Sequence, residues 1–132
     1  IRTIVSSVGD SDRRIERAVE LIAGHVETHP AHVRFIARER HGGVQSVREA
    51  IQDQLARFAG EVKEALAKDP LSEGWNDEDL LMLAHLYVDQ MLITASLFLD
   101  VLEAPEDERH RVAQAATRRM RLISIGREHW LD

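Results

Sequence analysis

Histidine is the residue type in this sequence with the most obvious capacity for metal chemistry. The chain has seven histidines, and His25 and His29 lie four residues apart, with His32 following just after Pro30. Zinc binds imidazole nitrogens, but a zinc site needs a third or fourth ligand, and a catalytic site also needs an open position. Histidines at the end of a helix are also favoured by the helix dipole. We therefore predict neither a metal site nor a cofactor.

Nucleophilic catalysis has little support in the sequence. There is no cysteine, so a thiolate nucleophile is impossible. Serines occur, but no Gly-x-Ser-x-Gly turn is found, and no strand is expected on which such a turn could be mounted. The glycine patterns of phosphate-binding and dinucleotide-binding loops are also missing. We predict that the protein is not an enzyme.

Three polar residues interrupt the most apolar part of the chain. Tyr87, Gln90 and Thr94 lie between residues 80 and 101. They fit an ordinary core in which each side chain is hydrogen-bonded, which is the interpretation that the pattern alone favours. They also fit an apolar cavity in which a few polar groups orient a ligand. The apolar side chains that would form the walls of such a cavity are Phe35, Phe58, Met91 and Phe98.

Arg40 raises the same question, because it ends the apolar helical face that begins at Val33. Its stem could lie along the edge of the core with its head in water. Alternatively, its guanidinium and the exposed amides of Gly42 and Gly43 could bind a phosphate or carboxylate. The residues alone favour the structural interpretation.

Apolar residues recur with a period near 3.6 in every long segment, which predicts an all-α fold. We expect a helix at residues 1–8 that stops at Gly9-Asp10, and a left-handed stop at Gly42-Gly43. Ser46 and Glu49 form a capping-box pattern, and Asn76 is expected to cap the next helix. The further helices are expected at about residues 13–28, 30–41, 46–69, 77–103 and 105–130.

The segment 77–103 is apolar around most of its circumference and must be covered from several sides. A transmembrane span is disfavoured because His85, Asp89 and Asp100 would be costly in lipid. One subunit of five or six helices covers only part of such a helix, so a partner helix is expected to cover the remainder. Ala115 and Gly126 would let that helix approach closely. The expected dimer-interface residues are Leu97, Val101, Val112, Ala116, Arg119, Met120, Ile123, Arg127 and Trp130.

Length and composition indicate one domain spanning residues 1–132. The chain has 44% apolar and 30% charged residues, the balance of a globular protein. Its formal net charge of −6 has the wrong sign for binding nucleic acid or an anionic membrane over the whole surface. The absence of cysteine fits a reducing cytoplasm, and no signal peptide is recognised at the start. We expect a cytoplasmic protein that does not bind membranes.

Two stretches resemble a known family. "FIARERHGGVQSVREAIQDQLARFAGEV" and "RRMRLISIGREHW" are similar to segments of the fatty-acid-responsive TetR-family transcriptional repressors of the FabR and DesT type. In these stretches Arg38 and Arg40 match the family's Arg-Glu-Arg positions, whereas His41 stands where close relatives have serine. The resemblance covers most of residues 11–132, and the chain resembles the C-terminal domain of such proteins.

The resemblance implies a homodimer in which the last two helices of each subunit form a four-helix interface. It also implies a long-chain fatty acyl effector of the acyl-CoA type, repression of fatty acid metabolism genes, and operator DNA binding through an N-terminal helix-turn-helix domain that this sequence does not contain. The alternatives are a TetR-type regulator of another hydrophobic or drug-like ligand, and a ligand-free helical interaction module. The expected pocket residues are Phe35, Arg40, Phe58, Tyr87, Gln90, Met91, Thr94 and Phe98.

Overall fold

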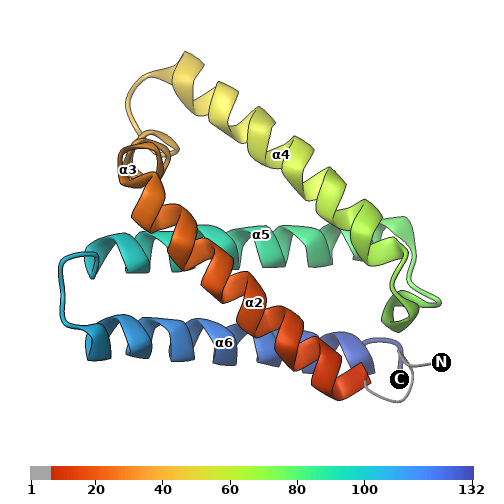
Figure 1. Cartoon of the computed structure of the whole chain (residues 1–132). Coiled ribbons are helices and arrows are strands. Elements are labelled where there is room, and N and C mark those ends of the chain that lie inside the picture. The colour runs from red at the N-terminus through yellow and green to blue at the C-terminus, as the bar shows by residue number, and fades with distance from the viewer. Residues whose placement is uncertain (1–6) are drawn as a thin grey trace.

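The computed structural model describes residues 7–132 and is built from helices (Figure 1). The described residues contain no strand, which confirms the predicted all-α class. The elements are α2 (Ser7–Thr28), α3 (Pro30–Glu39), α4 (Gln45–Ala67), the short 3-10 helix η1 (Pro70–Ser72), α5 (Asp77–Asp100) and α6 (Glu106–His129).

Helix α5 is the centre of the arrangement and contacts all four other α-helices. Figure 1 shows α5 and α6 side by side and antiparallel, with α2 crossing both of them obliquely. Helix α4 meets α5 near the C-terminal end of α4 and diverges from it toward its own N-terminus. Helix α3 lies at the wide end of the wedge that α2, α4 and α5 form.

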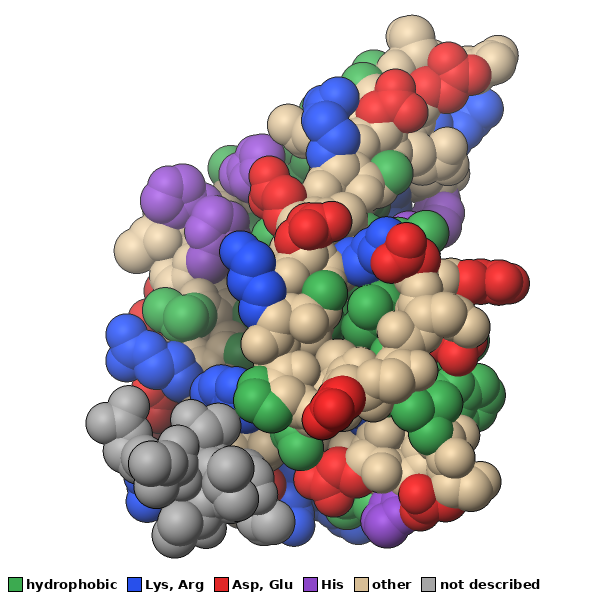
Figure 2. All heavy atoms as spheres, turned by 90° about the vertical axis from the view of Figure 1, so that its right-hand side faces the viewer, with side chains coloured by type: hydrophobic (Ala, Val, Ile, Leu, Met, Phe, Trp, Pro, Cys, Tyr) green, Lys and Arg blue, Asp and Glu red, His purple; other side chains and the backbone are tan. Residues whose placement is uncertain are grey.

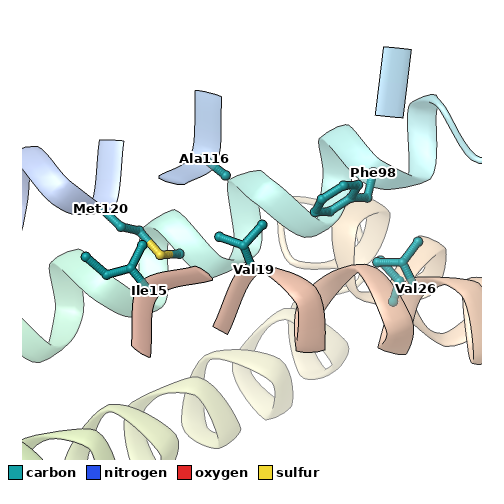
Figure 3. Packing of buried hydrophobic residues seen from close by; sticks show 7 residues of the cluster. Ile15, Val19, Val26, Phe98, Ala116 and Met120 are labelled. Atoms are coloured by element: carbon teal, nitrogen blue, oxygen red, sulfur yellow. The ribbon is translucent and has the colours of Figure 1, made fainter. Parts of the chain in front are cut away.

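The core lies where α2, α5 and α6 meet (Figure 3). Ile15, Val19 and Val26 of α2 are spaced to share one helical face. Figure 3 shows Ile15 beside Met120 of α6 and Val26 at the other end of the cluster, toward Phe98 of α5. Phe98 of α5, 5% exposed, and Val33 of α3, 8% exposed, belong to the same cluster. Full burial of each large apolar side chain contributes about 1.5–3 kcal/mol to folding. This core therefore holds the frame of the molecule.

The predicted break at Gly9-Asp10 is wrong, because α2 runs through both residues without interruption. A glycine in a helix interior costs only about 0.5–1 kcal/mol relative to alanine, and burial of the α2 stripe exceeds that cost. The expected helix at residues 1–8 lies mostly outside the described residues.

The turn between α3 and α4 also differs from the prediction. Among the described glycines only Gly74 has a positive φ, at 87°, so Gly42-Gly43 is not a left-handed stop. Helix α4 begins one residue before Ser46, and its N-cap Val44 has no side-chain cap hydrogen bond. Gln45 Nε2 instead donates to Glu49 Oε1 at 2.9 Å. The capping box fails because Ser46 already lies inside the first turn.

The start of α5 agrees with the expectation from the sequence. Asn76 Oδ1 accepts a hydrogen bond from the Asp79 amide at 2.8 Å, and residues 77–79 are acidic. Both features satisfy or complement the exposed amides of a helix N-terminus. Pro105 is the N-cap of α6 and not its first helical residue, a difference of one position.

Charge is mixed on the face seen in Figure 2, where acidic and basic side chains are interspersed with exposed hydrophobic side chains. A surface that binds the nucleic acid backbone carries a basic patch or stripe. This face carries no such single-sign field.

Candidate ligand-binding site

A cavity of about 840 Å³ fills the wedge between α2, α3, α4 and α5. Small-molecule sites typically enclose about 300–1,000 Å³ and are lined mostly by apolar side chains. The apolar lining comes from four helices and one residue of α6: Ala18, Leu21, Ile22, Val33, Ile36, Ala37, Ile51, Leu55, Phe58, Val62, Leu66, Met91, Leu92, Ala95 and Met120.

The wall supplied by α4 explains why the cavity exists. Ile51, Leu55, Phe58, Val62 and Leu66 recur at intervals of three or four and line the cavity along one helical face. Because α4 diverges from α5, this face meets open space along much of its length. Only Ile51 and Ala59 of the whole helix are buried. The lined stretch of α4 is about 22 Å long at 1.5 Å per residue, which suits an elongated apolar ligand.

Polar side chains collect at the wide end of the cavity, where α3 meets α2 and α4. His25, His32, Arg40 and Gln54 line this end. His25 stacks on His29 with the ring centroids 4.9 Å apart and the planes at 11°. Stacked rings do not aim their nitrogens at a common point, and no group of three potential metal ligands occurs in the part of the chain that the structure describes.

A second, smaller cavity of about 200 Å³ adjoins the narrow end. Four residues line both cavities, namely Ala18, Leu66, Tyr87 and Met120. The remaining lining is largely polar and comes from Ser11, Arg14, Ile15, Asp69, Ser124 and Arg127. The main cavity therefore ends beside a smaller one that has several polar side chains in its lining.

Charged side chains are concentrated around the narrow end of the main cavity, which we call the inner end. Arg127 Nη2 donates to Ser72 Oγ at 2.5 Å and lies 3.6 Å from Asp69 Oδ2. Arg14 Nη1 lies 3.2 Å from the same carboxylate oxygen. The Arg127 side chain is 5% exposed and that of Arg14 is 57% exposed, so Arg127 is the buried cation of the pair.

Tyr87 lies at the junction of the two cavities. Burial raises the pKa of its phenol above the ordinary value of 10.0, and contacts with Arg127 and Ser124 oppose part of that effect. A neutral hydroxyl therefore faces the ligand space at neutral pH.

The structure brings together only some of the predicted pocket residues. Arg40, Phe58, Tyr87 and Met91 line the main cavity. Phe35 does not, since it is 42% exposed on the outside of α3.

Three predicted pocket residues of α5 lie elsewhere. Gln90 Oε1 accepts a hydrogen bond from Arg119 Nε at 3.2 Å, and Thr94 and Phe98 are buried. These residues lie on the same broad apolar arc of α5 as Tyr87 and Met91, since residues seven apart share a helical face. Neighbouring helices cover Thr94 and Phe98, whereas Tyr87, Met91 and Ala95 line the cavity.

The α2 wall and, apart from Phe58, the α4 stripe were missed as pocket residues from the sequence. Both read as ordinary amphipathic stripes, and periodicity does not distinguish a stripe that packs against a helix from one that faces a void. The divergence of α4 from α5, which decides this, is a property of the tertiary structure.

The predicted interface residues are also divided. Ala116, Met120 and Arg127 are buried in the chain's own core, where a second subunit cannot reach them, which corrects the prediction. Leu97, Val101, Val112, Arg119 and Ile123 are half-buried, and Trp130 is 52% exposed.

The stripe of α6 assigned to a partner from the sequence is thus the stripe that packs on α2 and α5. The exposed apolar residues of α5 and α6 are different ones. They are Leu81, Met82, Leu86, Ile93, Leu122 and Ile125.

Helix α5 is long and apolar enough to cross a membrane by length and composition, and 28% of its most apolar window is buried within the chain. The central helix of a bundle has the same character. His85 and Asp89 on its exposed side would be costly in lipid. Helix α5 carries no clear membrane-span signal.

No protein-family model, curated protein or solved structure matches this chain significantly.

Proposed function

We propose that this chain is the effector-binding and dimerisation domain of a TetR-type transcriptional repressor, and that its effector is a long-chain fatty acyl compound. The observation that carries the proposal is the apolar cavity of about 840 Å³, walled along its length by one face of α4. Removing an aliphatic chain from water into such a space is favourable by about 25 cal/mol per Å² of apolar surface.

The two segments that resemble fatty-acid-responsive repressors both border the cavity. The first, residues 35–62, forms the end of α3 and most of α4, including Arg40 and Phe58 of the lining. The second, residues 118–130, contributes Met120 to the main cavity and Ser124 and Arg127 to the smaller one. The resemblance therefore falls on the parts of the chain that enclose the ligand space.

Dimerisation is supported by an exposed apolar face on α5 and α6. Met82, Leu86 and Ile93 are 41–44% exposed and follow one side of α5. On the neighbouring side of α6, Leu122 is 72% exposed. Exposed apolar stripes on adjacent helices are typical of an interface.

Gly126 leaves room for a helix packed on this face. It lies in the interior of α6, and an added Cβ would meet nothing within 4 Å. Glycine in a helix interior costs stability, and no contact within the described chain requires it there. A helix of a second subunit could approach closely at Gly126, because no side chain stands in its way.

In this proposal, binding of the effector changes the arrangement of the two subunits, and the protein catalyses no reaction. Helix α2 both lines the cavity and packs on α6, which carries half of the proposed interface. An effector in the cavity would favour one of two dimer arrangements, and the affinity of an N-terminal helix-turn-helix domain for operator DNA would change by linkage.

The test of effector binding is thermal unfolding with fatty acids and acyl-CoAs of 6 to 20 carbons, a range chosen to bracket the cavity length. We expect the melting temperature to rise with chain length, because a ligand at 100 times its Kd stabilises the folded state by about 2.7 kcal/mol. Ala95→Trp, which places an indole in the cavity, should abolish the rise. An unchanged melting temperature with every chain length would overturn the proposal.

The dimer is tested by sedimentation of the Leu86→Glu variant. A carboxylate on the exposed face should shift the protein to monomers, because burying an unpaired charge is costly. The matched control is Val44→Glu, at a residue that is 54% exposed in the turn between α3 and α4. Equal behaviour of the two variants would contradict the proposed interface.

A further inference from the structure

The inner end of the ligand space contains buried hydrogen-bond donors that have no acceptor. Among the described residues, Arg127 Nε and Ser11 Oγ are buried without a hydrogen-bond partner. Both residues line the small cavity that adjoins the narrow end of the main one. Buried donors without partners cost about 1–3 kcal/mol each, and more when charged, so a group that accepts from them is expected here.

The charge balance of this small cavity identifies the kind of acceptor. Arg14 and Arg127 both approach one carboxylate oxygen of Asp69, at 3.2 and 3.6 Å. The other polar lining groups are the hydroxyls of Ser11, Tyr87 and Ser124, which are neutral at pH 7. Two cations and one anion leave a net positive charge beside the buried Arg127. A ligand anion would complete the balance.

We propose that this small cavity is a carboxylate subsite, and that the effector is a free long-chain fatty acid bound with its carboxylate at the inner end. The carboxylate accepts from Arg127 Nε and from the Ser11 hydroxyl, and the aliphatic chain extends past Tyr87 along the α4 stripe toward Arg40. This inference rests on the proposed function and specifies its effector.

The size of the small cavity distinguishes a free acid from a thioester. About 200 Å³ holds a carboxylate and is too small for the nucleotide of coenzyme A. The nucleotide of an acyl-CoA would have to extend out of this space past the exposed Arg14 or lie at the opposite end, near Arg40. That end offers the half-buried Arg40 and two exposed histidines. The side chain of Arg127 is 5% exposed, so water screens its charge less than that of Arg40.

The experiment compares three ligands with the same chain on the unaltered protein: palmitic acid, methyl palmitate and palmitoyl-CoA, each displacing the neutral dye Nile red. One charge-assisted hydrogen bond contributes enough that the acid should bind about 10- to 100-fold more tightly than the ester. Equal affinity of acid and ester, or tightest binding by palmitoyl-CoA, would overturn the subsite while leaving the proposed function in place. Binding of none of the three would overturn both.

Substitutions locate the carboxylate at one end of the cavity. Ser11→Ala and Arg14→Gln should each lower the ratio of acid to ester affinity severalfold, and Arg127→Gln should remove the preference. Because Arg127→Gln also leaves Asp69 short of a partner and could unfold the protein, the ligand series and the first two variants carry the test.

The matched control is Arg17→Gln, at an exposed arginine of α2 that lines neither cavity, and it should leave the ratio of acid to ester affinity unchanged. Arg40→Gln tests the opposite orientation of the ligand: with the carboxylate at the inner end, the preference for acid over ester should be kept even if the affinity for both ligands falls. If Arg40→Gln alone removed the preference for the acid over the ester, the carboxylate subsite at the inner end would be overturned.

Discussion

The two sides of α5 are packed in opposite ways. On the side of α2 and α6, the core residues interdigitate and Val26 and Ala116 are fully buried. On the side of α3 and α4, the apolar side chains line a cavity of about 840 Å³, and two of the 23 residues of α4 are buried. A fold can therefore concentrate its stability in one layer and keep ligand space in another, although both layers are built from the same kind of amphipathic helix.

Two phenylalanines test that contrast most strongly. Phe98 is 5% exposed in the core, and Phe58 is 38% exposed on the cavity wall. Phe98→Ala should cost about 3–5 kcal/mol of unfolding free energy through lost burial and a new cavity. Phe58→Ala should cost about 1 kcal/mol or less and weaken binding of long-chain ligands. Urea unfolding of both variants measures the difference, and equal losses would show that the cavity wall is packed as tightly as the core.

Adding volume should also be tolerated less in the core than on the cavity wall. Ala116 is 0% exposed in the core, so Ala116→Leu should overpack it and cost about 1–3 kcal/mol. Ala37 lines the cavity, so Ala37→Leu should leave stability nearly unchanged and exclude the longest ligands. Unfolding free energy and the ligand chain-length profile of the two variants are the measurements. A large loss in Ala37→Leu would mean that the space beside α3 is smaller than the structure shows.

One core residue breaks the rule that buried hydroxyls are satisfied. Thr94 is fully buried, and its Oγ1 has no hydrogen-bond partner among the described residues. Thr94→Val keeps the shape and removes the unsatisfied group, so the protein should gain about 1 kcal/mol. Thr117→Val is the control, because Thr117 Oγ1 donates to the Ala113 carbonyl at 2.9 Å and its loss should bring no gain. Differential scanning calorimetry of both variants would decide, and a loss in Thr94→Val would point to a partner of Thr94.

The helical elements were predictable because apolar period and capping chemistry are local. The stripe of α2 and the Asn76 cap follow from residues within one or two turns of each other. The turn at Gly42-Gly43 was mispredicted because glycine permits positive φ without requiring it, and the Arg48 side chain, which donates to the Gly42 carbonyl, stabilises a different geometry.

The site was predictable only in part, because it depends on which face of α5 meets which neighbour. Periodicity places Tyr87, Met91, Thr94 and Phe98 on one apolar arc of the helix, but it does not say which part of that arc neighbouring helices cover and which part faces a cavity. Arg127 shows the same limit. Its position on α6 suggested a charge offered to a second subunit, whereas its partners Ser72 and Asp69 are 55 and 58 residues away in the same chain and come together only in the fold.

The smallest expected effect is on the titration of Tyr87, which lies between the tightly packed core and the cavity. Tyr87 is the chain's single tyrosine, so the absorbance of tyrosinate reports this residue alone. Burial raises its pKa above 10.0 in the folded state, and the unfolded chain loses the proton first as the pH rises.

The contribution of Tyr87 to stability is therefore complete below pH 10 and declines above it. The native protein should titrate at higher pH than the protein in denaturant, and Tyr87→Phe should flatten the decline in unfolding free energy. Coincident native and denatured titrations would mean that water reaches Tyr87 freely, and the cavity would then be open at its inner end.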